Sequence, residues 1–129
     1  MPTSRWPAIL RSVALRLLIV DDNEEFLSSA ARLLESEGID VVGKASSGAE
    51  AVRLAKTLDP EVVLLDVLLG DEDGFDVAKH LAVAAPSVRV VLISTHSEED
   101  LAEGLAESTA AAFLPKRAVN AAAIRNALR

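Results

Sequence analysis

Residues 15–22 read LRLLIVDD, a run of large aliphatic residues that ends in two carboxylates. Two later stretches are also mostly aliphatic and end in polar residues, VVLLD at 62–66 in one Asp and VRVVLIST at 88–95 in Ser and Thr. Runs that are nearly continuous in Leu, Val and Ile are typical of parallel strands that helices cover on both faces. We therefore expect central strands over residues 15–20, 62–65 and 88–93.

Two weaker apolar segments are typical of edge strands. Residues 40–45 include Gly43, and residues 111–116 include Pro115, which cannot donate a hydrogen bond to a neighbouring strand. We expect these segments at the two edges of the same sheet.

The stretches between these segments have the spacing of amphipathic helices. The first presents Phe26, Ala30, Leu33 and Leu34 at intervals that place them on one helix face. Strand and helix patterns alternate five times along the chain. This alternation predicts a doubly wound α/β domain with a five-stranded parallel sheet between two layers of helices.

Length and composition restrict the classes of function. At 129 residues, half of them apolar, the chain suits one compact domain over residues 15–129. Residues 1–14 form an N-terminal extension, which we expect to be either disordered or a helix packed on the domain. The absence of cysteine excludes disulfides and thiolate chemistry and fits a cytoplasmic location. A net charge of -7 argues against nucleic-acid binding, and no apolar run approaches the roughly 20 residues that span a bilayer.

Polar residues follow four of the expected strands at the point where each strand ends. The carboxyl ends of parallel strands meet at one rim of the sheet, where open α/β folds bind their ligands. These residues are Asp21, Asp22, Asp66, Ser94, Thr95 and Lys116. One Asp after a strand is often only a helix cap, and Asp22 is also placed to cap the helix expected from Asn23. Together, however, the residues predict a single site.

The residue types at this rim indicate phosphoryl chemistry. Three crowded carboxylates repel one another, so they either take up protons or hold a cation. Their oxygens favour a hard ion, and we expect Mg²⁺. A carboxylate can attack a phosphorus centre when the charge on the transferred group is neutralised. Lys116 would supply a positive charge to that group, and the Ser94 hydroxyl would supply a hydrogen bond.

Four stretches carry a resemblance to a known family: LLIVDDNEEF at 17–26, VVLLDVLLGDEDGFDVAKHL at 62–81, VVLISTHSEED at 90–100 and AFLPKRA at 112–118. Over about residues 15–128 the sequence resembles the receiver domains of bacterial two-component response regulators. The acidic pair, the phosphoacceptor, the hydroxyl and the lysine occur in the family's order, each at the end of its strand.

The resemblance implies a flavodoxin-like fold with strand order 2-1-3-4-5 and Asp66 as the phosphoacceptor. It also implies that Mg²⁺ is bound by Asp22, Asp66 and the backbone carbonyl of Leu68, with Asp21 contributing through a water molecule.

The resemblance further implies a switch and its partners. Ser94 would move toward the phosphoryl group, and Phe113 would rotate inward. The phosphate would come from a histidine kinase or a histidine phosphotransfer protein. The fourth helix, the last strand and the last helix would bind a downstream protein or an output domain, and homodimerisation on phosphorylation is also compatible with the family. Residues 107–112 lack the glycines usual there, so we expect a longer or stiffer end of the fourth helix.

Leu68, Thr95 and His96 should surround the path of a water molecule that attacks the acyl phosphate. Leu68 cannot orient that water, and Thr95 adds bulk, so we expect slow self-dephosphorylation in a signalling switch that is not an enzyme in the usual sense. His96 would either orient the water or only obstruct it. Two alternatives remain at this stage. One is a pseudo-receiver scaffold, and the other is a Mg²⁺-dependent phosphohydrolase, which would normally carry a second Asp where Leu68 stands.

Overall fold

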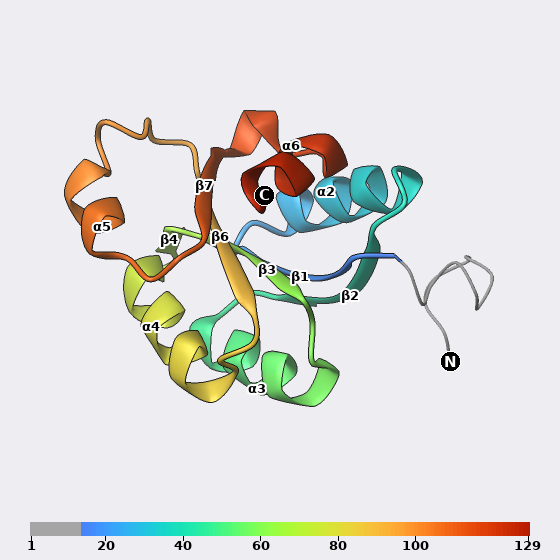
Figure 1. Ribbon diagram of the computed structural model, residues 1–129, viewed down its shortest axis with the longest axis horizontal. Coiled ribbons are helices and arrows are strands. Elements are labelled where there is room, and N and C mark those ends of the chain that lie inside the picture. The colour runs from blue at the N-terminus through green and yellow to red at the C-terminus, as the bar shows by residue number, and fades with distance from the viewer. Residues whose placement is uncertain (1–13) are drawn as a thin grey trace.

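A single parallel sheet forms the centre of the molecule (Figure 1). The computed structural model describes residues 14–129, so the predicted N-terminal extension lies outside the described residues except for Ala14. The strand order is β2-β1-β3-β6-β7, with every neighbouring pair parallel. The strands are β1 (Arg16–Val20), β2 (Asp40–Ala45), β3 (Val62–Asp66), β6 (Arg89–Ser94) and β7 (Ala112–Pro115). The predicted order 2-1-3-4-5 and both predicted edge strands are therefore confirmed.

Helices cover both faces of the sheet (Figure 1). On one face lie α2 (Glu24–Ser36) and α6 (Ala121–Ala127), and a short 3-10 turn, η1 (Lys116–Ala118), precedes α6. On the other face lie α3 (Gly48–Leu58), α4 (Gly74–Ala84) and α5 (Ala102–Glu107). Alternate side chains of each strand point to opposite faces. In β1, Leu17 and Ile19 pack under α2 and α6, whereas Leu18 and Val20 pack under α3 and α4.

The apolar face of α2 is rotated from the one predicted. Ala30 and Leu34 are buried as expected, but Leu33 is 43% exposed and Leu27 is buried. The prediction for Leu33 was wrong because Leu33 and Leu34 differ by 100° around the helix, and it is Leu34, 0% exposed, that faces the sheet.

The fourth predicted helix is short, so the expectation of a longer end was wrong. The helix α5 has six residues, buries none of them and has no side-chain cap at its N-terminus. Gly104 also weakens the helix, because glycine has a low helix propensity. Its missing side chain leaves room for the ring of Phe75. The helix therefore stops at Glu107, and Ser108 is extended.

A small hairpin that was not predicted follows β3 directly. It consists of β4 (Leu68–Leu69) and β5 (Glu72–Asp73), paired antiparallel. Gly70 turns the chain with a φ of 62°, a left-handed conformation that favours glycine. The hairpin thus occupies the rim of the sheet beside Asp66.

Candidate phosphoacceptor site

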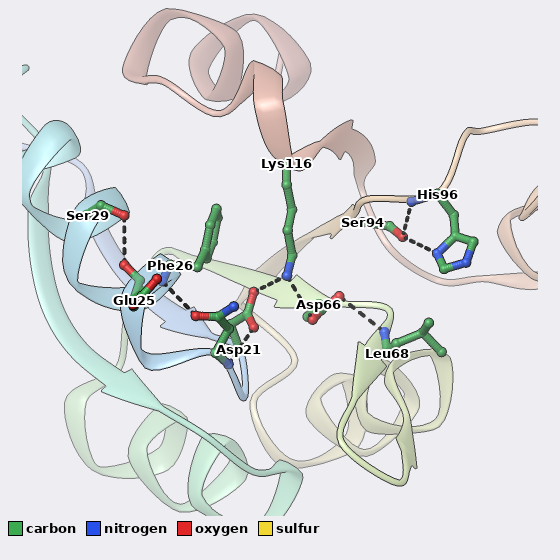
Figure 2. Close-up of polar contacts among 10 residues, drawn as sticks. Asp21, Glu25, Phe26, Ser29, Asp66, Leu68, Ser94, His96 and Lys116 are labelled. Carbon is green, nitrogen blue, oxygen red and sulfur yellow. Dashed lines mark hydrogen bonds and ion pairs between the residues drawn. The ribbon is translucent and has the colours of Figure 1, made fainter.

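Three charged side chains from three different strand ends meet at the rim of the sheet (Figure 2). Asp66 ends β3, Asp21 follows β1, and Lys116 follows β7. The Lys116 Nζ lies 2.6 Å from Asp21 Oδ2 and 3.1 Å from Asp66 Oδ2. Asp21 and Asp66 are 0% and 5% exposed, so these are buried ion pairs. The parallel fold therefore brings together residues that are up to 95 positions apart in the sequence, Asp21 and Lys116.

Asp22 completes an acidic cluster that fits a cation. Asp21, Asp22 and Asp66 each offer a carboxylate oxygen, and these oxygens all lie within 4.8 Å of one another. Asp22 is exposed, and Asp21 Oδ2 is buried with no partner other than the ion pair to Lys116. A buried oxygen that has one cationic contact and no directed hydrogen bond retains capacity for a metal or for water bound to it. The all-oxygen donor set suits Mg²⁺, which takes few carboxylates.

Burial is the main influence on the ionisation of Asp66. It raises the pKa of Asp66 from 3.8 to about 6, and the negative charge of Asp21 acts in the same direction. The charge and hydrogen bond of Lys116, and the hydrogen bond from Leu68, oppose this shift. For Lys116 the largest single influence is burial, which lowers the pKa, but the two carboxylates together raise it above 10.5. Lys116 therefore stays protonated, and the ionised Asp66 has excess negative charge around it.

Asn23, and not Asp22, caps the helix α2. The Asn23 side chain accepts a hydrogen bond from the Phe26 N–H at 3.1 Å, and Asp21 Oδ1 accepts one from the Asn23 N–H at 2.9 Å. The predicted capping role of Asp22 was therefore wrong. Because Asn23 supplies the cap, Asp22 is left on the exposed side of the cluster.

The switch hydroxyl predicted at Ser94 is buried at the end of β6 and faces His96 (Figure 2). Ser94 Oγ accepts a hydrogen bond from the His96 N–H at 2.9 Å and lies 3.4 Å from His96 Nδ1. The side chains of Thr95 and His96 are exposed. The hydroxyl is thus at the rim but engaged with His96.

Leu68 and Phe113 lie in different parts of the fold, Leu68 in strand β4 of the hairpin that follows β3 and Phe113 in the edge strand β7 of the main sheet. The Leu68 N–H donates to Asp66 Oδ1 at 3.2 Å, which holds the Leu68 peptide beside the carboxylate, and its side chain is 53% exposed. Phe113 is half-buried in β7 and lines a groove of about 490 Å³ with residues of α5. Among the described residues, no side-chain hydrogen bond or ion pair links Phe113 to the rim.

Phe26 is a site residue that the sequence reasoning assigned only to core packing. Its ring centroid lies 4.9 Å from Lys116 Nζ, within the range of a cation–π contact (Figure 2). The available signal was its position in the first turn of the helix that follows the acidic pair, because that turn adjoins the rim.

Comparison with known proteins agrees with this geometry. The family model described as response regulator receiver domain matches residues 17–129. The chain therefore belongs to the receiver domains of two-component response regulators, a class of signalling switches, and neither the scaffold nor the phosphohydrolase alternative is favoured.

Individual relatives support the same assignment. The transcriptional regulatory protein LiaR of Bacillus subtilis is 32% identical over 116 residues, which are 89% of this chain and 54% of LiaR. The chain spans about half the length of the curated relatives it matches. The solved receiver domain of NarL from Mycobacterium tuberculosis is 34% identical, with a TM-score of 0.74 over 82% of this chain and 86% of that one. A response regulator from Burkholderia pseudomallei, solved with a phosphorylated aspartic acid, a calcium ion and citrate, is 28% identical, with a TM-score of 0.77 over 88% of this chain and 66% of that one.

Within residues 14–129, every helix is too short or too polar to cross a lipid bilayer.

Proposed function

We propose that Asp66 accepts a phosphoryl group from the phosphohistidine of a histidine kinase or a histidine phosphotransfer protein. The observation that carries the proposal is the buried Asp66 carboxylate, 3.1 Å from Lys116 Nζ and within the acidic cluster. The response regulator from Burkholderia pseudomallei supports it, because that relative was solved with a phosphorylated aspartic acid and a calcium ion.

In the proposed transfer, an ionised oxygen of Asp66 attacks the phosphorus. The new P–O bond forms as the P–N bond to the donor imidazole breaks, and the imidazole nitrogen takes the electron pair. Mg²⁺, held by Asp22, Asp66 and the Leu68 carbonyl, with Asp21 acting through water, would neutralise charge on the transferred group when bound. The assignment of a metal rests on the cluster of carboxylate oxygens and on the buried Asp21 Oδ2, which has no hydrogen-bond partner.

Lys116 would then exchange one partner for another. Its Nζ already contacts Asp66 Oδ2, so a small movement brings it to a phosphoryl oxygen, where it balances the added negative charge. The Ser94 hydroxyl would break its contact with His96 and donate a hydrogen bond to another phosphoryl oxygen. Phe113 would occupy the space that Ser94 vacates, which links the site to β7 and α5.

The lifetime of the acyl phosphate is proposed to depend on Leu68, Thr95 and His96. All three are exposed beside the rim, so they border the path of an attacking water. The apolar Leu68 offers that water no hydrogen bond, and we expect slow self-dephosphorylation.

The downstream event is proposed to be binding of a partner protein or an output domain, with homodimerisation on phosphorylation as one form of it.

We further propose that residues 15–129 act as one receiver unit with residues 1–14 as an extension. The unit would work in the cytoplasm without binding nucleic acid itself, in line with its net charge of -7.

Intact-mass measurement with acetyl phosphate and Mg²⁺ tests the proposal. The wild type should gain the mass of one phosphoryl group, and Asp66→Asn should gain none. Asp71→Asn is a matched control, because Asp71 is an exposed residue in the turn of the hairpin that follows Asp66. Full incorporation in Asp66→Asn, with no transfer to Asp21 or Ser94, would show that the phosphoacceptor is elsewhere.

A further inference from the structure

Two neighbouring side chains of β5 link the hairpin that follows Asp66 to two helices, α3 and α4. Asp73 caps α4 by accepting a hydrogen bond from the Phe75 N–H at 2.8 Å. Glu72 reaches in another direction, and its Oε1 accepts a hydrogen bond from the Gly48 N–H at 2.9 Å. The strand β5 is therefore tied both to the helix that follows it and to a helix 24 positions earlier in the chain.

The contact between Glu72 and Gly48 has the features of a specific site. Gly48 is the first residue of α3, where a carboxylate meets a backbone N–H with no partner inside the helix and the positive end of the helix dipole. The normal cap is supplied separately, because Ser47 Oγ accepts from the Glu50 N–H at 3.2 Å. A Cβ on Gly48 would collide with Glu72 Oε2 and would lie 2.8 Å from Val77 Cγ2. Glycine at this position thus lets the carboxylate approach.

The strand pairing within the hairpin links the contact between Glu72 and Gly48 to the acidic cluster. Glu72 pairs with Leu69, and Asp73 pairs with Leu68, whose N–H donates to Asp66 Oδ1. At the tip, a Cβ on Gly70 would lie 3.9 Å from Asp22 Oδ2. The hairpin therefore contacts the cluster at Asp66 through the Leu68 N–H, and its tip at Gly70 lies near Asp22.

We propose that Glu72 is a positioning residue for the metal site. By holding β5 against the N-terminus of α3, it keeps the paired strand β4, and with it the Leu68 peptide, at the distance from Asp22 and Asp66 that the ion requires. This inference rests on the proposed Mg²⁺ site. Leu69 is 2% exposed and also anchors the hairpin, so the loss of Glu72 alone should loosen the site without destroying it.

Two substitutions separate the hydrogen bond from the charge. Glu72→Gln keeps an acceptor of the same length and removes the charge, whereas Glu72→Asp keeps the charge and is one methylene too short to reach Gly48. Mg²⁺ affinity is measured by titration calorimetry. We expect Glu72→Asp to weaken the Mg²⁺ affinity by about threefold or more, a loss on the scale of one hydrogen bond of modest strength. Glu72→Gln should keep the Mg²⁺ affinity within about twofold of the wild type.

Asp71→Asn is the matched control for charge, because this exposed neighbour makes no side-chain hydrogen bond or ion pair among the described residues. A second readout is the rate of labelling by acetyl phosphate at increasing Mg²⁺. Glu72→Asp should require more Mg²⁺ for half-maximal labelling and should reach the same maximal rate. A general loss of stability would not shift the Mg²⁺ requirement in this way.

Each outcome decides between distinct explanations. If Glu72→Gln and Asp71→Asn weaken Mg²⁺ binding as much as or more than Glu72→Asp, charge controls affinity and the positioning role of Glu72 is wrong. If all three variants bind like the wild type, Glu72 does not position the site. If the wild type itself binds no Mg²⁺, the proposed metal site fails, which is a separate result from the failure of Glu72.

Discussion

Replacement of Asp66 by Asn should remove a measurable share of the pH dependence of stability. The pKa of Asp66 in the folded protein is raised to about 6 by burial and by the charge of Asp21, against 3.8 for an ordinary Asp. A folded-state pKa above the unfolded value means that the folded state holds the proton more tightly. The contribution of Asp66 to stability is therefore greatest at low pH and is lost as the pH rises through 6.

The size of the effect follows from the two pKa values. At pH 5 the folded Asp66 is about nine-tenths protonated, and at pH 7.5 it is almost fully ionised, whereas the unfolded chain is ionised at both pH values. Linkage over this interval lowers the free energy of unfolding by about 1 kcal/mol. The side chain is only 7% exposed, so solvent screens this contribution weakly.

Urea unfolding followed by circular dichroism, at pH 5 and pH 7.5 in EDTA, measures this contribution. Circular dichroism is preferred because the only tryptophan, Trp6, precedes the sheet and its helices in the sequence. The wild type should lose about 1 kcal/mol more stability than Asp66→Asn between the two pH values. Asp71→Asn should behave like the wild type. If Asp66→Asn and the wild type change equally, burial does not raise the pKa of Asp66.

Three further predictions concern neighbouring residues. Asp22→Ala should weaken Mg²⁺ binding about tenfold or more in titration calorimetry, without loss of apo stability because Asn23 supplies the helix cap; unchanged affinity would remove Asp22 from the ligand set. Leu68→Asn should shorten the lifetime of the phosphorylated protein by roughly tenfold if the new amide orients a water and removes ~1.4 kcal/mol of barrier; an unchanged decay by intact mass would contradict water orientation at this position. A double-mutant cycle of Phe26→Leu with Lys116→Met should give a coupling of about 0.5 kcal/mol in urea unfolding, and zero coupling would mean that the ring and the ammonium do not interact energetically.

The sheet and the charged centre of the site were predictable from the sequence for one physical reason. Long apolar runs specify buried parallel strands, and the residue that ends each run must lie at the rim. Asp66 and Lys116 lie at the ends of β3 and β7, so the shared direction of the strands places both at one rim, whereas the strand order that brings them close was implied by the resemblance to receiver domains.

The features that were missed depend on short segments or on a choice between adjacent residues. The strands β4 and β5 have two residues each, too few for an alternating pattern. In the run of Asp21, Asp22 and Asn23, each residue type can cap a helix, and the actual cap depends on the exact start of α2. The contact between Glu72 and Gly48 is set by the tertiary fold and leaves no pattern in the sequence.

The orientation of Ser94 has a consequence for the proposed switch. In the structure the hydroxyl accepts a hydrogen bond from the His96 N–H, a neutral contact of about 1 kcal/mol in net terms. A hydrogen bond from the same hydroxyl to a doubly charged phosphoryl group would be charge-assisted, with a net value of about 1.5–3 kcal/mol. The exchange therefore favours the phosphorylated arrangement by about 1 kcal/mol, enough to shift a two-state equilibrium roughly fivefold but not to complete the switch. The rest of the free energy must come from other contacts that differ between the two states of the domain.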